Sequence, residues 1–334
     1  MLPNRVGIQA LPPPPGIIGS LRAGFDAITA HIGLILLPLG LDLLLWLGPR
    51  VSVSRLMQPL LDEMRRLAPT AGLNTSDVNS MLEMYKALLE RFNLLVAIRT
   101  LPVGISSLMS GRMPIASPLG TPPMLQVDSI GQLVGLFALL TIIGWMLGGL
   151  YFYLVAGLVM TRSGAGTPPT VARAVAQTIV YSLIWAALVW SVGLPILFIA
   201  YLASAVNSLL GQGLVLFLGF ALLWLLVPLF FSPHGMYLRR QNALASFLGG
   251  FRLTRFTLPS SSLFVLAVFL VGAGLNLLWA VPAEDSWIAM VGLLGHAFIT
   301  TGLLASSFVY YQDMSAWLQT VLERISSGLP AQKV

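Results

Sequence analysis

The sequence predicts an all-α polytopic membrane protein with six transmembrane helices, short cytoplasmic amphipathic helices and a helical extracytoplasmic loop. Three observations predict this fold class. The 334-residue chain is 57% hydrophobic and only 9% charged, whereas a soluble domain carries about 25% charged residues. Its apolar residues occur in runs of about 20, the length that crosses a bilayer as a helix. Its basic residues gather in the short segments between alternate runs, as expected for cytoplasmic loops.

The chain begins with a segment that differs from a cleaved signal peptide. Residues 1–26 hold Arg5, Arg22 and the proline run Pro12–Pro15. A signal peptide has a short apolar core near its start and small residues at a cleavage site. We therefore expect 1–26 to be a cytoplasmic N-terminal tail with an amphipathic start, and 27–47 to be an uncleaved first transmembrane helix.

Five more apolar runs follow the first one. The predicted spans are Ala27–Leu47, part of Ile130–Met160, Gln177–Tyr201, Gly213–Phe231, Leu263–Val281 and Trp287–Tyr311. Residues 129–311 would thus form the five-helix remainder of the bundle, with a kink at Pro195, and 312–334 would form a cytoplasmic C-terminal tail. A short apolar stretch at 203–210 leaves five or seven spans open.

The distribution of charge predicts the orientation. With the N-terminus inside, the inner segments hold ten bases and three acids. The bases are Arg5, Arg22, Arg162, Arg173, Arg239, Arg240, Arg252, Arg255, Arg324 and Lys333. The outer loop after the fifth span holds Glu284 and Asp285 and no base. The positive-inside rule then places both termini in the cytoplasm of a multi-pass inner-membrane protein. Since topology explains the pI of about 10.0, we expect no nucleic-acid partner.

Four arginines cluster in the predicted cytoplasmic loop between spans four and five. They are Arg239, Arg240, Arg252 and Arg255. Between them, Leu244, Phe247, Leu248 and Phe251 recur at the spacing of one helical face. We expect a short amphipathic helix at the inner membrane surface, with the arginines reaching anionic lipid headgroups. An ordinary positive-inside loop without a ligand, and a specific headgroup or nucleotide site, are the alternatives.

A short motif occurs twice before predicted spans. Residues 20–25 read SLRAGF and residues 246–251 read SFLGGF, both of the form Ser-x-x-x-Gly-Phe. The segment GTPPTVARAVAQT, which begins at Gly166, offers a third candidate helix that Thr167 or Thr170 could cap. One hypothesis is a basic amphipathic helix followed by two spans, repeated three times. Convergence on a common solution at the membrane edge is the alternative.

The stretches GTPPTVARAVAQTIVYSLIW and NALASFLGGFRLTRFTLPSSSLFVLAVFLV carry a resemblance to a known family. They resemble bacterial six-span proteins related to the membrane domain of glycerophosphoryl diester phosphodiesterases, over roughly residues 130–311. The matching positions are Gly166, Pro168, Ala172, Ala243, Leu244, Ser246 and Arg252. The resemblance implies the six-span architecture. It implies no catalysis, because no segment of this sequence corresponds to the soluble phosphodiesterase domain.

Residues 48–128 form the predicted extracytoplasmic loop, which is longer than the resemblance implies. Apolar residues follow a helical stripe in 53–67, which Pro59 interrupts, and again in 78–96. These two helices could pair as a hairpin, lie along the outer membrane surface or dock on a partner. The following segment, 101–127, is rich in proline, glycine, serine and methionine. It could cover the outer mouth of the bundle or bind another subunit.

Polar residues within spans are the usual indication of transport. Asp42 lies in the first predicted span, Asn276 in the fifth and His296 near the middle of the sixth. Asp42 could instead lie at the interface or pair with Arg50 or Arg55. His296 could simply hydrogen-bond a neighbouring helix, with Asn276 as its partner.

Two glycine pairs and three tryptophans indicate helix packing and membrane interfaces, and neither group indicates catalysis or ligand binding. Gly131 with Gly135, and Gly144 with Gly148, would permit close helix approach in the second span. Trp46, Trp279 and Trp287 fall at the outer ends of spans, where an interfacial aromatic belt is expected.

The sequence contains no catalytic, cofactor or metal motif. It has no cysteine, no H-E-x-x-H, no Walker-type glycine loop and no G-x-G-x-x-G, and its three histidines share no ligand spacing. We therefore expect no enzymatic activity, no cofactor and no bound metal.

Two functions are compatible with these features. The preferred one is an accessory, assembly or scaffold subunit that binds a protein partner, or a second copy, through 48–128. The alternative is a small-molecule or lipid transporter that uses Asp42, Asn276 and His296. A hydrated cavity shared by these three residues would favour transport.

Overall fold

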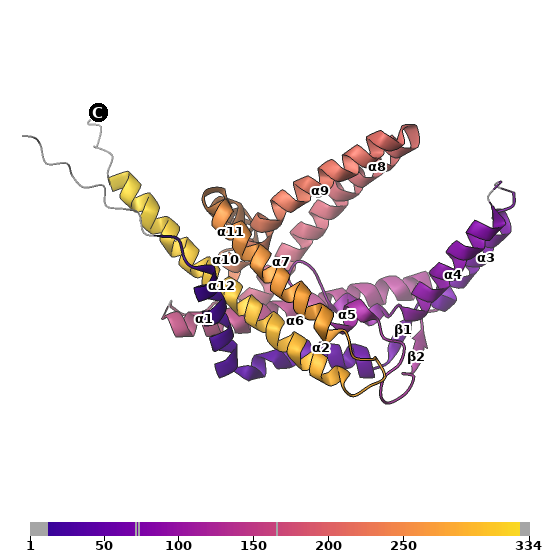
Figure 1. Cartoon of the computed structure of the whole chain (residues 1–334), viewed down its shortest axis with the longest axis horizontal. Helices are drawn as coiled ribbons and strands as arrows, with labels where there is room; N and C mark the ends of the chain where they lie inside the picture. Colours follow the sequence, from indigo (N-terminus) through magenta and orange to yellow (C-terminus); the bar gives the residue numbers. More distant parts are fainter. Residues whose placement is uncertain (1–12, 71, 73, 165, 328–334) are drawn as a thin grey trace, which may run out of the picture.

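The computed structural model describes residues 13–327 apart from 71, 73 and 165, and almost all of its regular elements are helices (Figure 1). The first elements are α1 (Ile17–Ala30), the 3₁₀ turn η1 (Ile32–Ile35) and α2 (Leu36–Leu47). The bundle continues with α6 (Ile130–Ser163), α7 (Val171–Leu188), the π-helical turn η3 (Val189–Gly193), α8 (Leu194–Val206), α9 (Ser208–Phe231), α10 (His234–Leu238), α11 (Ala243–Trp279) and α12 (Ala289–Ser327).

Five helical stretches are long and apolar enough to cross a membrane. They are Ile130–Ser163, Val171–Val206, Ser208–Leu238, Ala243–Trp279 and Ala289–Ser326. The pair Ile17–Ala30 and Ile32–Leu47 passes the same test as one broken span, bent by 95°. The fold is therefore that of an all-α polytopic membrane protein with five or six spans, as the sequence predicts.

The prediction of one continuous helix over 27–47 is wrong. Residues Ala27–Ala30 end α1, and His31 leaves the helical conformation with φ −136° and ψ 55°. The 3₁₀ turn Ile32–Ile35 follows this break, and it includes Leu34, whose carbonyl would clash with Pro38 in a continuous α-helix. In the structure Pro38 lies in the first turn of α2, where a proline is tolerated.

The passes of the chain alternate between two ends of the molecule (Figure 1). We call the end where α1 begins and α12 ends the terminal side, and the opposite end, which carries residues 48–128, the loop side. The described parts of both tails lie on the terminal side. Residues Arg5 and Lys333 lie outside the described residues, as do 1–12 and 328–334 of the two predicted tails. The tail predicted from residue 312 begins as a continuation of the last helix, because α12 extends to Ser327.

The separate amphipathic surface helix predicted around residues 244–251 is also wrong, because these residues form the first turns of α11. Leu244 and Leu248 are exposed, while Ser246 and Gly250 are buried. A Cβ atom on Gly250 would lie 2.5 Å from the carbonyl oxygen of Pro228 in α9. The small residues therefore face inward, because only they let α11 approach α9 this closely.

The repeated Ser-x-x-x-Gly motif has the same packing role at its first occurrence. Gly24 of α1 lies directly against the side chain and backbone of Ser306 in α12, and Ser20 is buried beside it. The helix that begins the second proposed repeat, α7, packs on α6, and the helix that begins the third, α11, packs on α9, in each case the last span of the preceding unit; α1 packs on α12, the last span of the chain. This regular pattern agrees with three repeated units, although a common origin stays a hypothesis.

Residues 48–128 fold into two different parts. Their elements are β1 (Arg50–Ser52), α3 (Ser54–Leu67), α4 (Thr75–Arg91), the 3₁₀ turn η2 (Leu94–Ile98), α5 (Met109–Arg112) and β2 (Met124–Gln126). Strands β1 and β2 pair in parallel, with Arg50 opposite Met124. Helices α3 and α4 form the hairpin that was one of the sequence-based alternatives, with a small core of its own made of Leu61, Ala68, Val78 and Leu82.

The second part, residues 93–123, packs on the bundle. Val103 and Met109 are fully buried in the main core. Of the α6 glycines expected to admit another helix, Gly144 and Gly148 admit this segment, because a Cβ on Gly148 would lie 2.8 Å from the Cα of Gly104. For Gly131 and Gly135 the expectation is wrong, because a Cβ there would meet no atom within 4 Å. The segment that sequence reasoning could only call irregular is therefore an integral layer on the loop side of the bundle.

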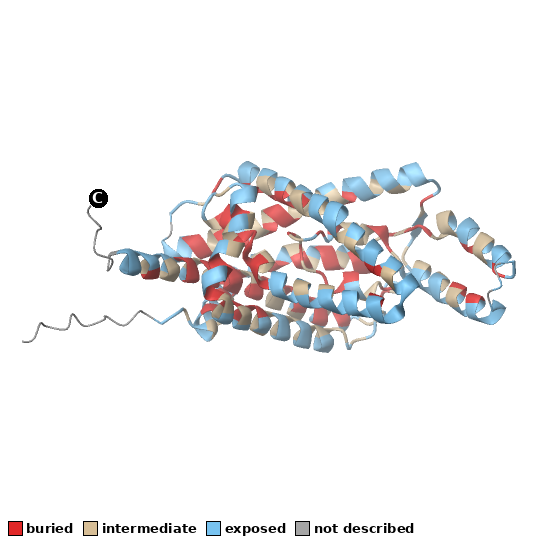
Figure 2. Cartoon of the chain, turned by 90° about the horizontal axis from the view of Figure 1, so that it is seen from above, coloured by how far each residue is buried: buried red, intermediate tan, exposed pale blue. Residues whose placement is uncertain are grey.

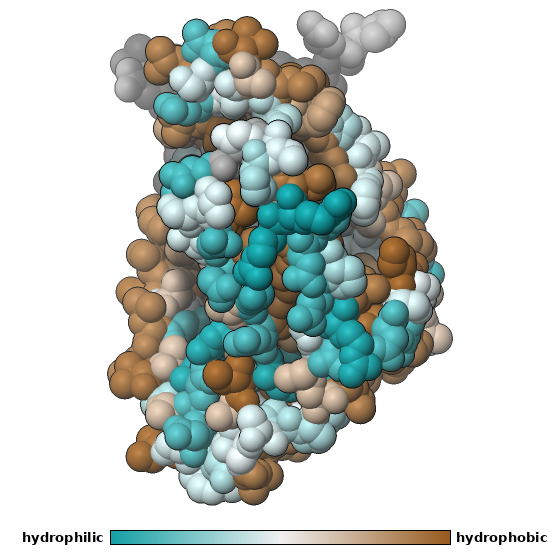
Figure 3. Space-filling model, turned by 90° about the vertical axis from the view of Figure 1, so that its right-hand side faces the viewer, coloured by the Kyte–Doolittle hydropathy of each residue, from teal (hydrophilic) through white to brown (hydrophobic). Residues whose placement is uncertain are grey.

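Two hairpins project from this core, α3–α4 and α8–α9 (Figure 1). Buried residues concentrate where the other helices converge, and the projecting hairpins are mostly exposed (Figure 2). Viewed from the loop side, polar residues gather near the centre of the face and apolar residues flank it (Figure 3). Such a distribution fits a polar end that emerges from an apolar, membrane-embedded belt.

The α8–α9 hairpin owes its shape to two local features. The expected kink at Pro195 takes the form of the π-helical turn at Val189–Gly193, which accommodates the backbone hydrogen bond that a proline cannot make. At the tip, Asn207 caps α9 by accepting from the backbone N–H groups of Leu209 and Leu210. No charged residue occurs between Arg173 and Arg239.

Candidate ligand cavity

A cavity of about 940 Å³ lies between the α8–α9 hairpin and the α11–α12 pair, with α6 and α7 completing its walls. Its lining is mostly apolar and includes Phe152, Trp185, Leu226 and Phe230. Leu222 of α9 and Phe269 of α11 line the cavity and are nevertheless 63% and 66% exposed. The cavity is therefore open between these two helices, along the surface that the membrane would cover.

The cavity exists because α9 and α11 touch near the terminal side and then diverge. Their contacts include that of Gly250 with the backbone around Pro228 and Ser232, and that of Phe264 with Phe231. From there α9 continues into the projecting hairpin, while α11 follows α12 (Figure 1). On the loop side, Leu101, Pro102 and Ser106 close the space. Segment 101–127 thus covers the mouth of the bundle in part, one of the two roles considered from the sequence.

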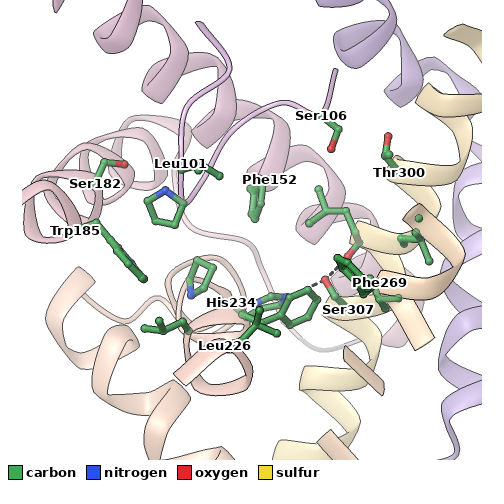
Figure 4. Close-up of a pocket in the computed structure, with 18 of the residues that line it drawn as sticks. Leu101, Ser106, Phe152, Ser182, Trp185, Leu226, His234, Phe269, Thr300 and Ser307 are labelled. Carbon is green, nitrogen blue, oxygen red and sulfur yellow. Dashed lines mark hydrogen bonds between the residues drawn. The ribbon is translucent and has the colours of Figure 1, made fainter. Parts of the chain in front are cut away.

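Hydroxyl and imidazole groups line the cavity at Ser106, Ser182, His234, Thr300 and Ser307, and three of these residues, Ser182, His234 and Ser307, are almost completely buried. Figure 4 shows Ser182 and Trp185 on one side of the cavity, Ser307 on the other, and His234 between them. The Nε2 atom of His234 lies 2.8 Å from the hydroxyl oxygen of Ser307. The Ser182 hydroxyl has no hydrogen-bonding partner among the described residues. Sequence reasoning missed this group.

The positions of these groups are set by hydrogen bonds between helices. Tyr181, the neighbour of Ser182, bonds the hydroxyl of Ser232, which holds α7 against the end of α9. Thr178, one turn earlier, bonds the hydroxyl of Tyr237 at 2.6 Å. Alternating polar residues in α7 and the sequence Ser-Pro-His at 232–234 were the only sequence signals for this wall, and neither matches a known motif.

The structure separates the three intramembrane polar residues predicted from the sequence. Asn276 lines the cavity, and its side-chain oxygen lies 2.7 Å from Nδ1 of His296, the neighbour expected from the sequence. Asp42 lies elsewhere, fully buried against segment 101–127. It accepts hydrogen bonds from the Ser107 hydroxyl at 2.6 Å and the Met109 N–H at 2.9 Å. The three residues therefore do not line one common cavity.

The expected partners of Asp42 are also wrong. Arg50 donates to the backbone oxygen of Glu90, and burial lowers the pKa of its guanidinium. Arg55 forms an ion pair with Asp128 at 3.0 Å. Asp42 is thus an anchor for segment 101–127 and is not paired with a cation within hydrogen-bonding distance among the described residues.

The loop side holds further ties between residues far apart in the sequence. The carboxylate of Glu284 pairs with Arg91 at 3.3 Å and accepts from the Ile115 N–H at 3.2 Å. Trp46, expected in an interfacial belt, is buried and donates to the backbone oxygen of Glu284 at 2.7 Å. These contacts fix residues 48–128 to the loop between α11 and α12.

The arginine cluster on the terminal side divides into two kinds. Arg240 donates to the backbone oxygens of Thr167 and Pro168, and Arg173 donates to the backbone oxygen of Arg240 at 2.8 Å. Arg240 therefore joins two loops of the bundle. Arg252 and Arg255 are exposed on α11.

Arg239 differs from both kinds, because its guanidinium lies 5.8 Å from the ring centre of Tyr311. A headgroup role thus stays a prediction for Arg239, Arg252 and Arg255, while Arg240 has a structural role, because it joins two loops of the bundle. In the described part of the chain, no three acidic or histidine side chains come together as a metal site.

Comparison of this chain with protein-family models, with curated proteins and with solved structures finds no match. The class of the protein, a multi-pass all-α membrane protein, therefore rests on its own helices. The cavity is the feature of the structure that bears on its function.

Proposed function

We propose that this protein is a membrane carrier or permease for a lipid-like molecule, which it takes up laterally from the bilayer into the cavity between α9 and α11. The observation that carries this proposal is the cavity itself. Ligand sites are concave, mostly apolar and typically about 300–1,000 Å³ in volume, and this cavity has about 940 Å³. Its side opening between Leu222 and Phe269 suits a ligand that reaches it through the membrane.

The proposed location is the bacterial inner membrane, with the terminal side in the cytoplasm. Support comes from the arginines of the loops at this side, among them Arg162, Arg173 and Arg240. Contacts such as that of Arg240 with Thr167 bring these loops together at one end of the molecule. The positive-inside rule assigns such an end to the cytoplasm.

The proposal differs from an ion pathway through Asp42, Asn276 and His296. Such a pathway would need the three side chains in one hydrated space. Asp42 is instead occupied by Ser107 and Met109. Only Asn276 lines the cavity, so the polar groups serve as fixed points in an apolar site.

The experiment compares two glycines of α11 that lie two residues apart. Gly272 lines the cavity, and a Cβ placed there would meet the flexible tip of Leu303 at 3.5 Å. Gly274 has no atom within 4 Å of such a Cβ and is exposed on the same helix. We expect Gly272→Phe to fill the cavity and Gly274→Phe to leave it open.

Lipid retained by each purified variant through size-exclusion chromatography in detergent is quantified by mass spectrometry. Gly272→Phe is expected to lose most of the retained lipid, with Gly274→Phe and the unaltered protein equal. Equal retention in all three proteins, with unchanged thermal stability, would contradict a ligand-binding role for the cavity.

A second function, that of an assembly or scaffold subunit, is favoured by the α3–α4 hairpin. Its outer surface exposes the large apolar side chains of Leu60, Leu67, Met84, Tyr85 and Leu88. A set of exposed apolar residues on one projecting element is typical of a protein-binding surface. The hairpin contributes no residue to the cavity, so both functions can be tested separately.

The hairpin can be removed without cutting the core. Its two ends are joined because the side chain of Asn93 accepts from the N–H of Val51 at 3.0 Å. Replacing 54–91 with a short Gly/Ser linker should therefore preserve the bundle and the lipid retained in the cavity. Proteins that co-purify from native membranes with the full chain, and are lost with this variant, would support the scaffold function; an unchanged set would count against it.

A further inference from the structure

We infer that the ligand of the cavity is an uncharged lipid alcohol, a molecule with acyl or other apolar chains and a single hydroxyl-type polar end, of the kind that diacylglycerol represents. This inference rests on the proposed function and deepens it by naming the ligand class. The polar end would lie beside Ser182, near the His234–Ser307 pair, and the chains would fill the apolar part of the cavity. Three features of the cavity lead to this class: its lining has no charged side chain, the Ser182 hydroxyl has no hydrogen-bonding partner among the described residues, and its walls are mostly apolar.

The first argument is charge. The described residues that line the cavity include no lysine, arginine, aspartate or glutamate. A phosphate or carboxylate moved into an apolar site without a counter-charge loses its hydration and gains no partner. The exposed arginines, Arg252 and Arg255, are not among the lining residues. The cavity is therefore suited to a ligand whose buried end is neutral.

The second argument is the hydrogen-bonding state of the polar groups. The Ser307 hydroxyl donates to the backbone oxygen of Leu304 at 2.7 Å and is within 2.8 Å of His234. The Ser182 hydroxyl, on a residue only 1% exposed, has no partner in the described chain. Buried hydroxyls are nearly always paired. A ligand hydroxyl can both donate to and accept from Ser182, which supplies the missing bond.

The third argument is the direction of the cavity. Ser182 is fixed near the terminal side, because its neighbour Tyr181 bonds Ser232 and the contact of Gly250 with α9 lies there. Figure 4 shows Leu101 and Phe152 between Ser182 and Ser106 across the cavity, whose side towards α11 is open. The hydroxyls of Ser106 and Thr300 also line the cavity, and the wall between them and Ser182 is mostly apolar, which suits a ligand with long apolar chains.

The test uses two probes with the same dibrominated acyl chains, diacylglycerol and phosphatidic acid. Bromine quenches tryptophan fluorescence on contact, and Trp145, Trp185 and Trp190 line the cavity. The full chain is titrated in detergent micelles, and only the quenching that Gly272→Phe abolishes is counted. We expect dibrominated diacylglycerol to bind at least about ten-fold more tightly than phosphatidic acid.

The variant that tests the polar end is Ser182→Ala, with Ser191→Ala as its matched control. Ser191 is an exposed residue of η3 whose hydroxyl bonds the backbone oxygen of Ala187. Loss of one hydrogen bond to an uncharged group corresponds to an affinity change of about 2- to 13-fold. We expect Ser182→Ala to weaken diacylglycerol binding within this range and Ser191→Ala to leave it unchanged.

The outcomes separate the inference from the proposed function. Binding of phosphatidic acid equal to or tighter than that of diacylglycerol would overturn the inference, while specific quenching by either probe would still support a lipid-binding cavity. An unchanged affinity in Ser182→Ala would overturn the placement of the polar end. Absence of any quenching sensitive to Gly272→Phe would overturn the inference and the proposed function together.

Discussion

Helix α12 and the stretch formed by α7 and α8 are both long and apolar, yet they differ in how they are packed. In the most apolar part of α12, 56% of the residues are buried. In the most apolar part of Val171–Val206, only 6% are buried. The buried helix is the less hydropathic of the two. The buried residues of α12 include small and hydroxyl residues, such as Ser306 and Ser307, beside large ones such as Phe308. Hydropathy thus identifies residues that tolerate lipid, while small and polar residues identify those that contact other helices.

The largest expected effect tests the packed side of this comparison. Gly24→Leu in α1 would force a side chain into the backbone of Ser306 in α12. Because neither helix can give way locally, we expect a loss of about 3 kcal/mol of stability, the upper end of the usual range for overpacking, measured by thermal unfolding in detergent. The control is Gly19→Leu in the same helix, where a Cβ meets no atom within 4 Å. Equal stability of the two variants would contradict the tight packing of α1 against α12 at Gly24.

The next largest effect concerns the attachment of segment 101–127. Asp42→Ala leaves the Ser107 hydroxyl and the Met109 N–H without their acceptor. Unsatisfied buried donors cost about 1–3 kcal/mol, so the segment should become sensitive to limited proteolysis. Asp26→Ala removes only the exposed pair with Arg22, worth at most about 1 kcal/mol. Protection of the segment in Asp42→Ala would show that its apolar contacts alone hold it.

A smaller effect is expected for a single hydrogen bond between helices. Thr178→Val keeps the shape of the side chain in α7 and removes its bond to Tyr237. Such bonds average about 0.6 kcal/mol in membrane proteins, so the melting temperature should fall only slightly. Thr161→Val removes a hydroxyl that bonds only the backbone of its own helix, at Gly157. A large fall in the melting temperature of Thr178→Val would show that hydrogen bonds between helices contribute more to the stability of the bundle than this average.

The smallest effect is expected in the projecting hairpin. At Gly219 of α9 a Cβ meets no atom within 4 Å. Alanine has the higher helix propensity, so Gly219→Ala should leave thermal stability unchanged or raise it slightly. Gly250→Ala, which meets the Pro228 oxygen, should lower it measurably. Destabilisation by Gly219→Ala would reveal a contact of the hairpin that the isolated chain lacks.

Sequence patterns predicted much of the fold and little of the cavity. Runs of about 20 apolar residues located the spans from α6 onward, and the hairpin α3–α4 was among the alternatives because helical periodicity is a local property. The break at His31 was missed, because hydropathy is uniform across it. The contact between His296 and Asn276 was anticipated, because both residues lie alone in adjacent spans.

The remaining site residues could not be predicted, because they depend on how helices diverge. Ser182 is one of several serines in apolar stretches, and nothing in its local sequence indicates that its hydroxyl lacks a partner. Asp42 resembled a transport residue, but its acceptor role depends on Ser107, 65 positions away in the chain. Long-range contacts of this kind have no periodic signature.

The sequence by itself determined that this chain is helical, multi-pass and rich in positive charge in the loops that follow every second span. These properties follow from transfer free energies and backbone hydrogen bonding, which depend on each segment separately. Only the tertiary structure decided that Gly24 and Gly250 are contact points, that Asp42 anchors a loop, and that a cavity lies between α9 and α11. The reason is that apolar helices in lipid can pair in many ways, and the pairing depends on shape complementarity between distant segments.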